Sequence, residues 1–231
     1  MLTTAYNDWD PPAVDERVYA PQEDSQLLID VMDKTGLARG RRVADLCTGS
    51  GVVAVAAADQ GAAEVSAFDI CPRAVHFARQ QISMAGANVT VHLGSWARAA
   101  EFGQYDLVVC NPPYVPHDPG VGGLDVPSHM GLARAWDAGY DGRLVLDPLC
   151  ESMRHLLADG GTMLLVQSEF AEPRKTLAAL ASSGLDAEIL AWQWIPFGPV
   201  LSARAQWLED TGRLEPGRRE EELVVIRADK A

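Results

Sequence analysis

Residues 42–51 read RVADLCTGSG, and this stretch decides the fold. Its first half is a short apolar run that predicts a buried strand, and its second half is a tight turn built on glycine. The next residues, Val52 to Gln60, are mostly alanine and valine and predict a helix. A strand, a glycine turn and a helix in immediate succession form one repeating unit of a parallel α/β sheet.

The same alternation continues on both sides of this stretch. A helix is predicted before it, over Gln26 to Met32, ending near Gly36. Further strands are predicted at 64–70, 88–93, 105–110, 161–167, 187–194 and 222–227, and further helices at 72–84, 143–157 and 172–182. The pattern predicts a Rossmann-like, doubly wound α/β sheet of seven strands. Because no strand–helix unit of the earlier kind joins the last two strands, we expect the final strand to run antiparallel.

The chain of 231 residues fits a single domain. We divide this domain into an N-terminal segment and helix (1–36), a core (37–195 and 222–228) and an insertion (196–221). The insertion is too long for a simple hairpin, and its residues Val200 to Asp210 predict a helix that serves as a lid or as an oligomer contact. A second long connection, Pro112 to Gly142, is rich in proline and glycine.

The composition is that of a soluble globular protein, with 48% hydrophobic and 22% charged residues. No apolar run reaches the roughly 20 residues that cross a membrane, and the polar first residues do not resemble a signal peptide. The four cysteines lack metal-binding spacing, so we expect reduced thiols, a cytoplasmic protein and no metal site. The net charge of −13 does not suit phosphate binding, so no direct contact with nucleic acid is expected.

Two features near the start of the sheet indicate a nucleoside-containing ligand. Gly49 and Gly51 let the backbone of the turn approach a ligand closely, and the helix that follows offers free N–H groups. Asp69 ends the next strand, where its carboxylate can accept hydrogen bonds from both hydroxyls of a ribose. A helix cap is the simpler role for Asp69, and the turn lacks the full G-x-G-x-x-G of dinucleotide-binding folds.

The third feature, Asn111-Pro112-Pro113-Tyr114, follows the fourth predicted strand directly. The two prolines fix the backbone and remove two N–H donors, which leaves the Asn111 side-chain oxygen and the Pro112 carbonyl as acceptors. Two rigid acceptors suit an NH2 group with two hydrogens to donate, and Tyr114 offers a flat face to a planar substrate. The motif therefore predicts a clamp that turns a nitrogen lone pair towards an electrophile.

Together these features resemble the class I methyltransferases that use S-adenosylmethionine, and within them the N-P-P-Y group that acts on glutamine amides or on the exocyclic amine of adenine. Residues 19–25, YAPQEDS, are similar to the opening motif of the HemK-related protein glutamine methyltransferases of eukaryotes and archaea. Residues 135–143, AWDAGYDGR, are similar to the segment that closes their substrate loop. The chain resembles the branch without the helical N-terminal domain of the bacterial release-factor enzymes.

The resemblance implies S-adenosylmethionine as cofactor and assigns roles to residues. Tyr19 would cover the cofactor, Glu23 and Asp24 would lie near its methionine part, and Asp69 would hold the ribose. The other implied cofactor residues are Asp45, Cys47, Gly49, Gly51, Ile70, Ser95, Trp96 and Asn111. The implied catalytic residues are Asn111, Pro112 and Tyr114, and the implied substrate contacts are Pro113, Tyr114 and Trp136. The chain departs from the family at Ser95, which stands where an aspartate usually lies near the adenine amine, and in the insertion 196–221.

The activity implied is N-methylation of a glutamine side-chain amide in a protein, for example a peptide-chain release factor, by direct displacement at the sulfonium. Three other functions stay open: methylation of a small amine or amide, methylation of a nucleic-acid amine, and cofactor binding without chemistry. The acidic net charge speaks against the nucleic acid. A small activating partner protein, which some eukaryotic relatives require, is a further expectation.

Overall fold

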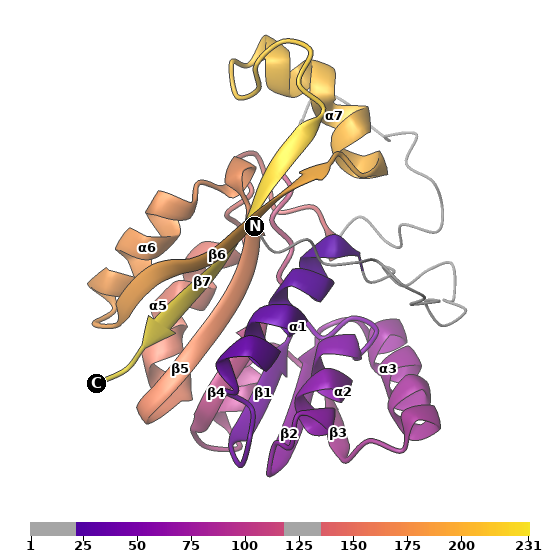
Figure 1. The fold of residues 1–231 in the computed structure, drawn as a ribbon, viewed down its shortest axis with the longest axis vertical. Helices are drawn as coiled ribbons and strands as arrows, with labels where there is room; N and C mark the ends of the chain where they lie inside the picture. The colour runs from indigo at the N-terminus through magenta and orange to yellow at the C-terminus, as the bar shows by residue number, and fades with distance from the viewer. Residues whose placement is uncertain (1–21, 118–134) are drawn as a thin grey trace.

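A seven-stranded sheet forms the centre of the computed structural model, which describes residues 22–117 and 135–231 (Figure 1). The strands are β1 (Arg42–Leu46), β2 (Glu64–Asp69), β3 (Val89–Leu93), β4 (Tyr105–Cys110), β5 (Leu157–Ser168), β6 (Asp186–Pro196) and β7 (Glu220–Asp229). They lie in the order β3-β2-β1-β4-β5-β7-β6. Strands β1 to β5 pair in parallel, and β7 pairs antiparallel with both β5 and β6. The predicted doubly wound sheet with an antiparallel last strand is confirmed.

Helices cover both faces of the sheet (Figure 1). They are α1 (Glu23–Thr35), α2 (Val52–Asp59), α3 (Pro72–Ala85), α4 (Trp96–Ala100), α5 (Leu146–Leu156), α6 (Pro173–Ser182) and α7 (Pro199–Asp210), with a short 3-10 turn at Glu169–Ala171. Helices α1, α2 and α3 pack side by side on one face, and α4, α5 and α6 pack on the other. Because both faces are covered, the central strands β1 and β4 are buried almost throughout, as their continuous apolar sequences predict.

Two predicted boundaries around α5 are wrong. The helix begins at Leu146 rather than Arg143, and β5 begins at Leu157 rather than Gly161. Arg143 lies before the helix because its buried guanidinium donates hydrogen bonds to the Ala171 carbonyl and to the Thr176 hydroxyl at 3.0 Å. Such long-range contacts decide boundaries that local periodicity does not.

The insertion 196–221 is a hairpin connection, contrary to expectation. Strands β6 and β7 pair along their whole length, from Asp186 opposite Asp229 to Pro196 opposite Glu220, and the connection between them carries the predicted helix, α7. In Figure 1 this helix lies at the far end of the β6–β7 pair. Its buried side chains are Val200, Leu201, Arg204, Ala205 and Leu208, so α7 packs into the fold.

The strand register brings the ends of several strands to one edge of the sheet. Leu46 at the end of β1 lies opposite Phe68 of β2 on one side and Cys110 of β4 on the other. The residues that follow these three strands therefore begin at one edge, although they are far apart in the sequence. This edge is where ligands of open α/β sheets bind.

Candidate active site

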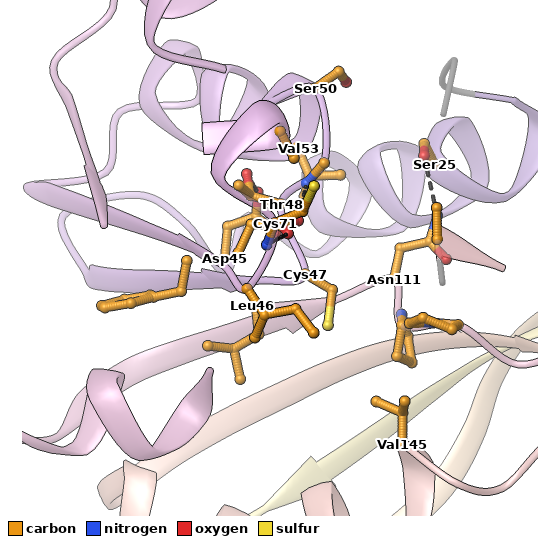
Figure 2. Close-up of a pocket in the computed structure, with 18 of the residues that line it drawn as sticks. Ser25, Asp45, Leu46, Cys47, Thr48, Ser50, Val53, Cys71, Asn111 and Val145 are labelled. Atoms are coloured by element: carbon orange, nitrogen blue, oxygen red, sulfur yellow. Dashed lines mark hydrogen bonds between the residues drawn. The ribbon is translucent and has the colours of Figure 1, made fainter. Parts of the chain in front are cut away.

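A cavity of about 320 Å³ lies at this edge of the sheet (Figure 2). Its size is that of a typical small-molecule site. The structure brings most of the predicted site residues to its walls: Asp24, Asp45, Cys47, Gly49, Asp69, Ile70, Ser95, Trp96, Asn111, Pro112, Pro113, Tyr114 and Trp136. They come from the start of α1, from the segments after β1, β2, β3 and β4, and from the segment before α5.

Three predicted residues do not line this cavity or lie outside the described residues. Gly51 is the N-cap of α2 with a φ of 86°, and a Cβ atom there would lie 3.3 Å from the side chains of Ala78 and Ile82. This glycine lets α2 and α3 pack closely, and it is not among the residues that line the cavity. Glu23 is exposed and borders a smaller neighbouring cavity. Tyr19 lies outside the described residues.

The glycine turn after β1 is held by hydrogen bonds to β1 and β2. The Thr48 hydroxyl donates to Asp45 Oδ2 at 2.5 Å, and the Thr48 amide donates to the Phe68 carbonyl at 3.0 Å. Both Cys47 and Gly49 have positive φ, 58° and 54°, a conformation that costs energy at a non-glycine residue such as Cys47. The turn is therefore a fixed, strained wall of the cavity.

Asp45 is a carboxyl group that titrates near neutral pH. Only 1% of it is exposed, and burial raises its pKa to about 7, although the hydrogen bond from Thr48 opposes this shift. The nearby charge of Asp69 raises the pKa further. Asp45 thus carries a proton for much of the time at pH 7.

The carboxylate of Asp69 is fixed by two main-chain donors. The Gly49 amide donates to Oδ2 at 2.9 Å, and the amide of Cys71, the N-cap of α3, donates to Oδ1 at 2.8 Å. Asp69 is therefore not the helix cap that the sequence offered as its simpler role, because the N-cap of α3 is Cys71 and Asp69 binds the amide of that residue. Each carboxylate oxygen can accept more than one hydrogen bond, so these two amides do not prevent Asp69 from accepting hydroxyl donors from the cavity.

Ser95 also serves as a helix cap. Its hydroxyl oxygen accepts the Ala97 amide at 3.3 Å and so begins the short helix α4. Next to it, Trp96 lines the cavity, and Ile70 on the neighbouring segment exposes 63% of its surface. These two side chains form an apolar rim beside Asp69.

The first turn of α1 holds the Asn111-Pro112-Pro113-Tyr114 segment in place. Asn111 Nδ2 donates to Ser25 Oγ at 3.1 Å, and Figure 2 shows this pair across the cavity from the turn at Cys47 and Thr48. The Tyr114 hydroxyl donates to Asp24 Oδ2 at 2.9 Å. Because Ser25 holds the NH2 end of the Asn111 amide, the amide oxygen is the end left to accept from a ligand.

These contacts change the role expected of Asp24. Its carboxylate lines the cavity but bonds to Tyr114 and to the Ser25 amide at 2.6 Å, so its main contacts are with the protein. Sequence reasoning missed Ser25 as a site residue, although it belongs to the quoted YAPQEDS motif. Other lining residues that it missed are Thr48, Ser50, Val53, Phe68, Cys71, Gly94 and Val145.

The two ends of the Pro112–Gly142 connection are joined to each other. The Val115 amide donates to the Trp136 carbonyl at 2.9 Å, and the Ala138 amide donates to the Val115 carbonyl at 3.0 Å. Arg204 of α7 covers this junction: it donates to the carbonyls of Val115 and Pro116, and its guanidinium lies 4.7 Å from the Trp136 ring centre. The insertion thus contacts the joined ends of the 112–142 connection through the buried Arg204.

Among the described residues, no group of three or more His, Cys, Asp and Glu side chains is placed to hold a metal ion. Within the same part of the chain, no helix is both long and apolar enough to span a bilayer.

Comparison with known proteins gives consistent matches. The family model "Methyltransferase small domain" matches residues 20–121. A putative protein N5-glutamine methyltransferase of Methanocaldococcus jannaschii is 29% identical over 189 residues, which are 81% of this chain and 91% of the relative. The release factor glutamine methyltransferase of Prochlorococcus marinus is 34% identical over 74% of this chain. This chain spans 61% of that bacterial relative.

Among solved structures, one similar chain comes from the Mtq2–Trm112 complex of E. cuniculi, which is described as responsible for methylation of the translation termination factor eRF1. It is 25% identical, with a TM-score of 0.60 over 93% of this chain and 99% of that one. The sheet, the cavity and these matches define the class: the protein is an S-adenosylmethionine-dependent methyltransferase. Within that class, the relatives it matches are named protein N5-glutamine methyltransferase and release factor glutamine methyltransferase.

Proposed function

We propose that this enzyme transfers the methyl group of S-adenosylmethionine to the side-chain amide nitrogen of a glutamine in a protein, and that a peptide-chain release factor is its substrate. The observation that carries the proposal is the fixed orientation of Asn111. Its NH2 group is tied to Ser25, so its oxygen is left to accept, and Pro112 lines the same cavity. The names of the M. jannaschii and P. marinus relatives support glutamine as the acceptor.

The residues that line the cavity match the parts of the cofactor. We assign the ribose to Asp69, whose carboxylate is already oriented by Gly49 and Cys71. The apolar rim of Ile70 and Trp96 fits the flat adenine, and the glycine turn allows close approach of the chain. Asp45, deeper in the same cavity, supplies a carboxyl group for the methionine part.

The chemistry needs orientation more than acid–base catalysis. The cofactor supplies an electrophilic methyl group on a positively charged sulfur. Asn111 Oδ1 and the Pro112 carbonyl accept the two hydrogens of the substrate amide, which draws the nitrogen lone pair out of conjugation and aims it into the cavity. Tyr114, held by Asp24, forms a wall against the planar amide. Holding two reactants in line in this way accounts for a large part of a rate enhancement.

Charge favours a protein substrate over a nucleic acid. The net charge is −13, and Arg134 is the single basic residue of the 112–142 connection in the sequence. A phosphate backbone would meet repulsion there, whereas a basic protein loop would be attracted. We also propose that the enzyme works in the cytoplasm and with a small activating protein, as the two-protein complex from E. cuniculi suggests.

The test is methyl transfer from labelled S-adenosylmethionine into purified release factor, with mass spectrometry to locate the methyl group. We expect labelling of one glutamine and loss of labelling when that glutamine is replaced by asparagine. DNA, RNA and the small-molecule fraction of an extract are assayed in parallel, each with and without a candidate activating protein. Labelling of nucleic acid by the enzyme alone at about 0.15 M salt, or labelling confined to small molecules, would contradict the proposal.

A further inference from the structure

A second, smaller cavity of about 40 Å³ lies beside the first. Four residues line both cavities and form the wall between them: Asp24, Tyr114, Val115 and Trp136. Its other walls come from the ends of β6 and β7, at Ile195 and Glu221, and from the start of α7. The smaller cavity therefore lies directly next to the tyrosine of the clamp, and it has room for a small polar group.

Two residues that line this cavity each have a buried polar atom with no hydrogen-bond partner among the described residues. One is Oε2 of Glu221, a residue that is 5% exposed. The other is the indole nitrogen of Trp136, a residue that is 8% exposed. The first is an acceptor and the second is a donor. Native proteins pair nearly all such buried atoms, with protein or with water, so the two atoms in this cavity wall mark a place where a polar group can bind.

The charges around Glu221 favour a hydrogen-bond donor as the partner of its Oε2 atom. Burial raises the pKa of Glu221 to about 7, a hydrogen bond with Ser168 opposes this shift, and the nearby carboxylates of Asp24, Glu169 and Glu23 add to it. The neighbouring cation, Arg218, is paired with Glu169 at 2.6 Å. A donor from a bound molecule would offset this acidic surrounding.

We propose that the smaller cavity binds a main-chain peptide group of the protein substrate, next to the glutamine that is methylated. A peptide group has one acceptor and one donor: its carbonyl oxygen accepts from Trp136 Nε1, and its N–H donates to Glu221 Oε2. A lysine or arginine side chain fits less well, because it has no acceptor for the indole N–H. This inference rests on the proposed function, since it takes a glutamine within a polypeptide as the substrate.

The cavity would then explain how the enzyme selects its substrate class. The clamp at Asn111 recognises an NH2 group, which free glutamine and many small amides also carry. A peptide group bound beside Tyr114 adds a contact that only a polypeptide supplies. Glu221 and Trp136 are then specificity residues, and their loss should raise KM for a peptide without lowering kcat.

The experiment uses a synthetic peptide with the sequence around the release-factor glutamine and two ester analogues, in which the N–H on either side of that glutamine is replaced by oxygen. For the full-length wild-type enzyme, we expect one ester analogue to raise KM about tenfold while kcat changes less than about twofold. Glu221→Leu should raise KM for the normal peptide about tenfold and should no longer distinguish it from that ester.

Two further variants act as controls. Glu221→Gln keeps a carbonyl acceptor and should stay within about threefold of the wild-type KM. Glu220→Gln changes the exposed neighbour on β7, which does not line the cavity, and should leave KM unchanged. Circular dichroism and calorimetric S-adenosylmethionine affinity establish that each variant is folded.

Equal KM values for the peptide and both esters with the wild type would overturn the inference, as would an unchanged KM in a folded Glu221→Leu enzyme. Failure of the proposed function has a different signature. In that case the wild type methylates neither the peptide nor the release factor, and the inference falls with it.

Discussion

At the scale of single residues, the site depends on side chains that hold other side chains. Asn111 and Tyr114 are the groups assigned to the substrate, but Ser25 and Asp24 fix their orientation. A clamp with free rotation would lose much of its effect, because misplacement by a fraction of an ångström weakens in-line attack. The first turn of α1 therefore belongs to the active site. Its residues act on the substrate nitrogen only by orienting Asn111 and Tyr114.

Asn111→Ala removes one of the two acceptors proposed for the substrate amide. We expect turnover to fall by about 10² or more, because orientation is lost, while affinity for S-adenosylmethionine stays within about twofold. Single-turnover kinetics and calorimetry measure the two quantities. Asn88→Ala, at an exposed position, is the matched control. A parallel loss of cofactor affinity and turnover would mean that Asn111 is structural.

Asp69→Ala removes the carboxylate proposed to bind the ribose. Charge-assisted hydrogen bonds are worth about 1.5–3 kcal/mol each, so we expect affinity for S-adenosylmethionine to fall by about tenfold or more. The fold should persist, because water can replace Asp69 as the acceptor for the Gly49 and Cys71 amides. Calorimetry compares this variant with Asp186→Ala, at an exposed position on β6. Unchanged affinity in a folded Asp69→Ala protein would refute the ribose assignment.

Much of the site was predictable from the sequence, for a simple reason. Asp45, Asp69 and Asn111 each stand at the end of an apolar run, and parallel strands place their carboxyl ends at one edge. Ser25 was missed because it meets Asn111 across 86 positions of sequence, and the choice of that partner depends on how α1 docks. No local pattern carries this information.

At the scale of elements, the hairpin of β6 and β7 places α7 against the ends of the 112–142 connection. Arg204, 2% exposed, reaches from this helix to the carbonyls of Val115 and Pro116 and lies 3.6 Å from Asp137 Oδ2. The sequence predicted α7 correctly because its periodicity is local. The hairpin was not predicted because its strands pair across a connection much longer than an ordinary turn.

Arg204→Met keeps the length of the side chain but removes the guanidinium. The carbonyls it served stay buried, so the free energy of unfolding should fall by about 3 kcal/mol. KM for a protein substrate should rise, since the contacts of Arg204 with Val115 and Pro116, at one end of the 112–142 connection, are lost. Urea unfolding and steady-state kinetics test this, with Arg174→Met at an exposed position on α6 as control. Wild-type stability in Arg204→Met would show that α7 does not brace the loop.

At the scale of the whole molecule, two buried carboxyl groups make stability depend on pH. The pKa values of Asp45 and Glu221 are raised to about 7 in the folded protein, from ordinary values of 3.8 and 4.5. At pH values between the ordinary pKa values and about 7, the folded state binds more protons than the unfolded state. Stability is therefore highest at the acidic side of this range and falls as pH rises towards 7.

We expect the free energy of unfolding to decrease from pH 5 to pH 7.5, by at most about 1.4 kcal/mol per pH unit for each of the two groups. Asp45→Asn should flatten the slope, because it removes one of the two titrating groups. Asp59→Asn, at an exposed position on α2, should leave the slope as it is. Urea unfolding of the cofactor-free protein at a series of pH values measures this, and a slope of opposite sign in the wild type would contradict it.

The way α1 joins the clamp also bears on how the enzyme is made in the cell. Its first turn holds Asn111 and Tyr114, while the body of the helix packs against β5 and β7. During translation, α1 is therefore made early. The strands against which it packs are complete only when β7 has left the ribosome. Arg204, which contacts the Pro116 carbonyl, is also a late product of synthesis. Prematurely terminated chains should lack methyl transfer altogether, so an enzyme proposed to act on the termination machinery becomes active only when its own translation has run through.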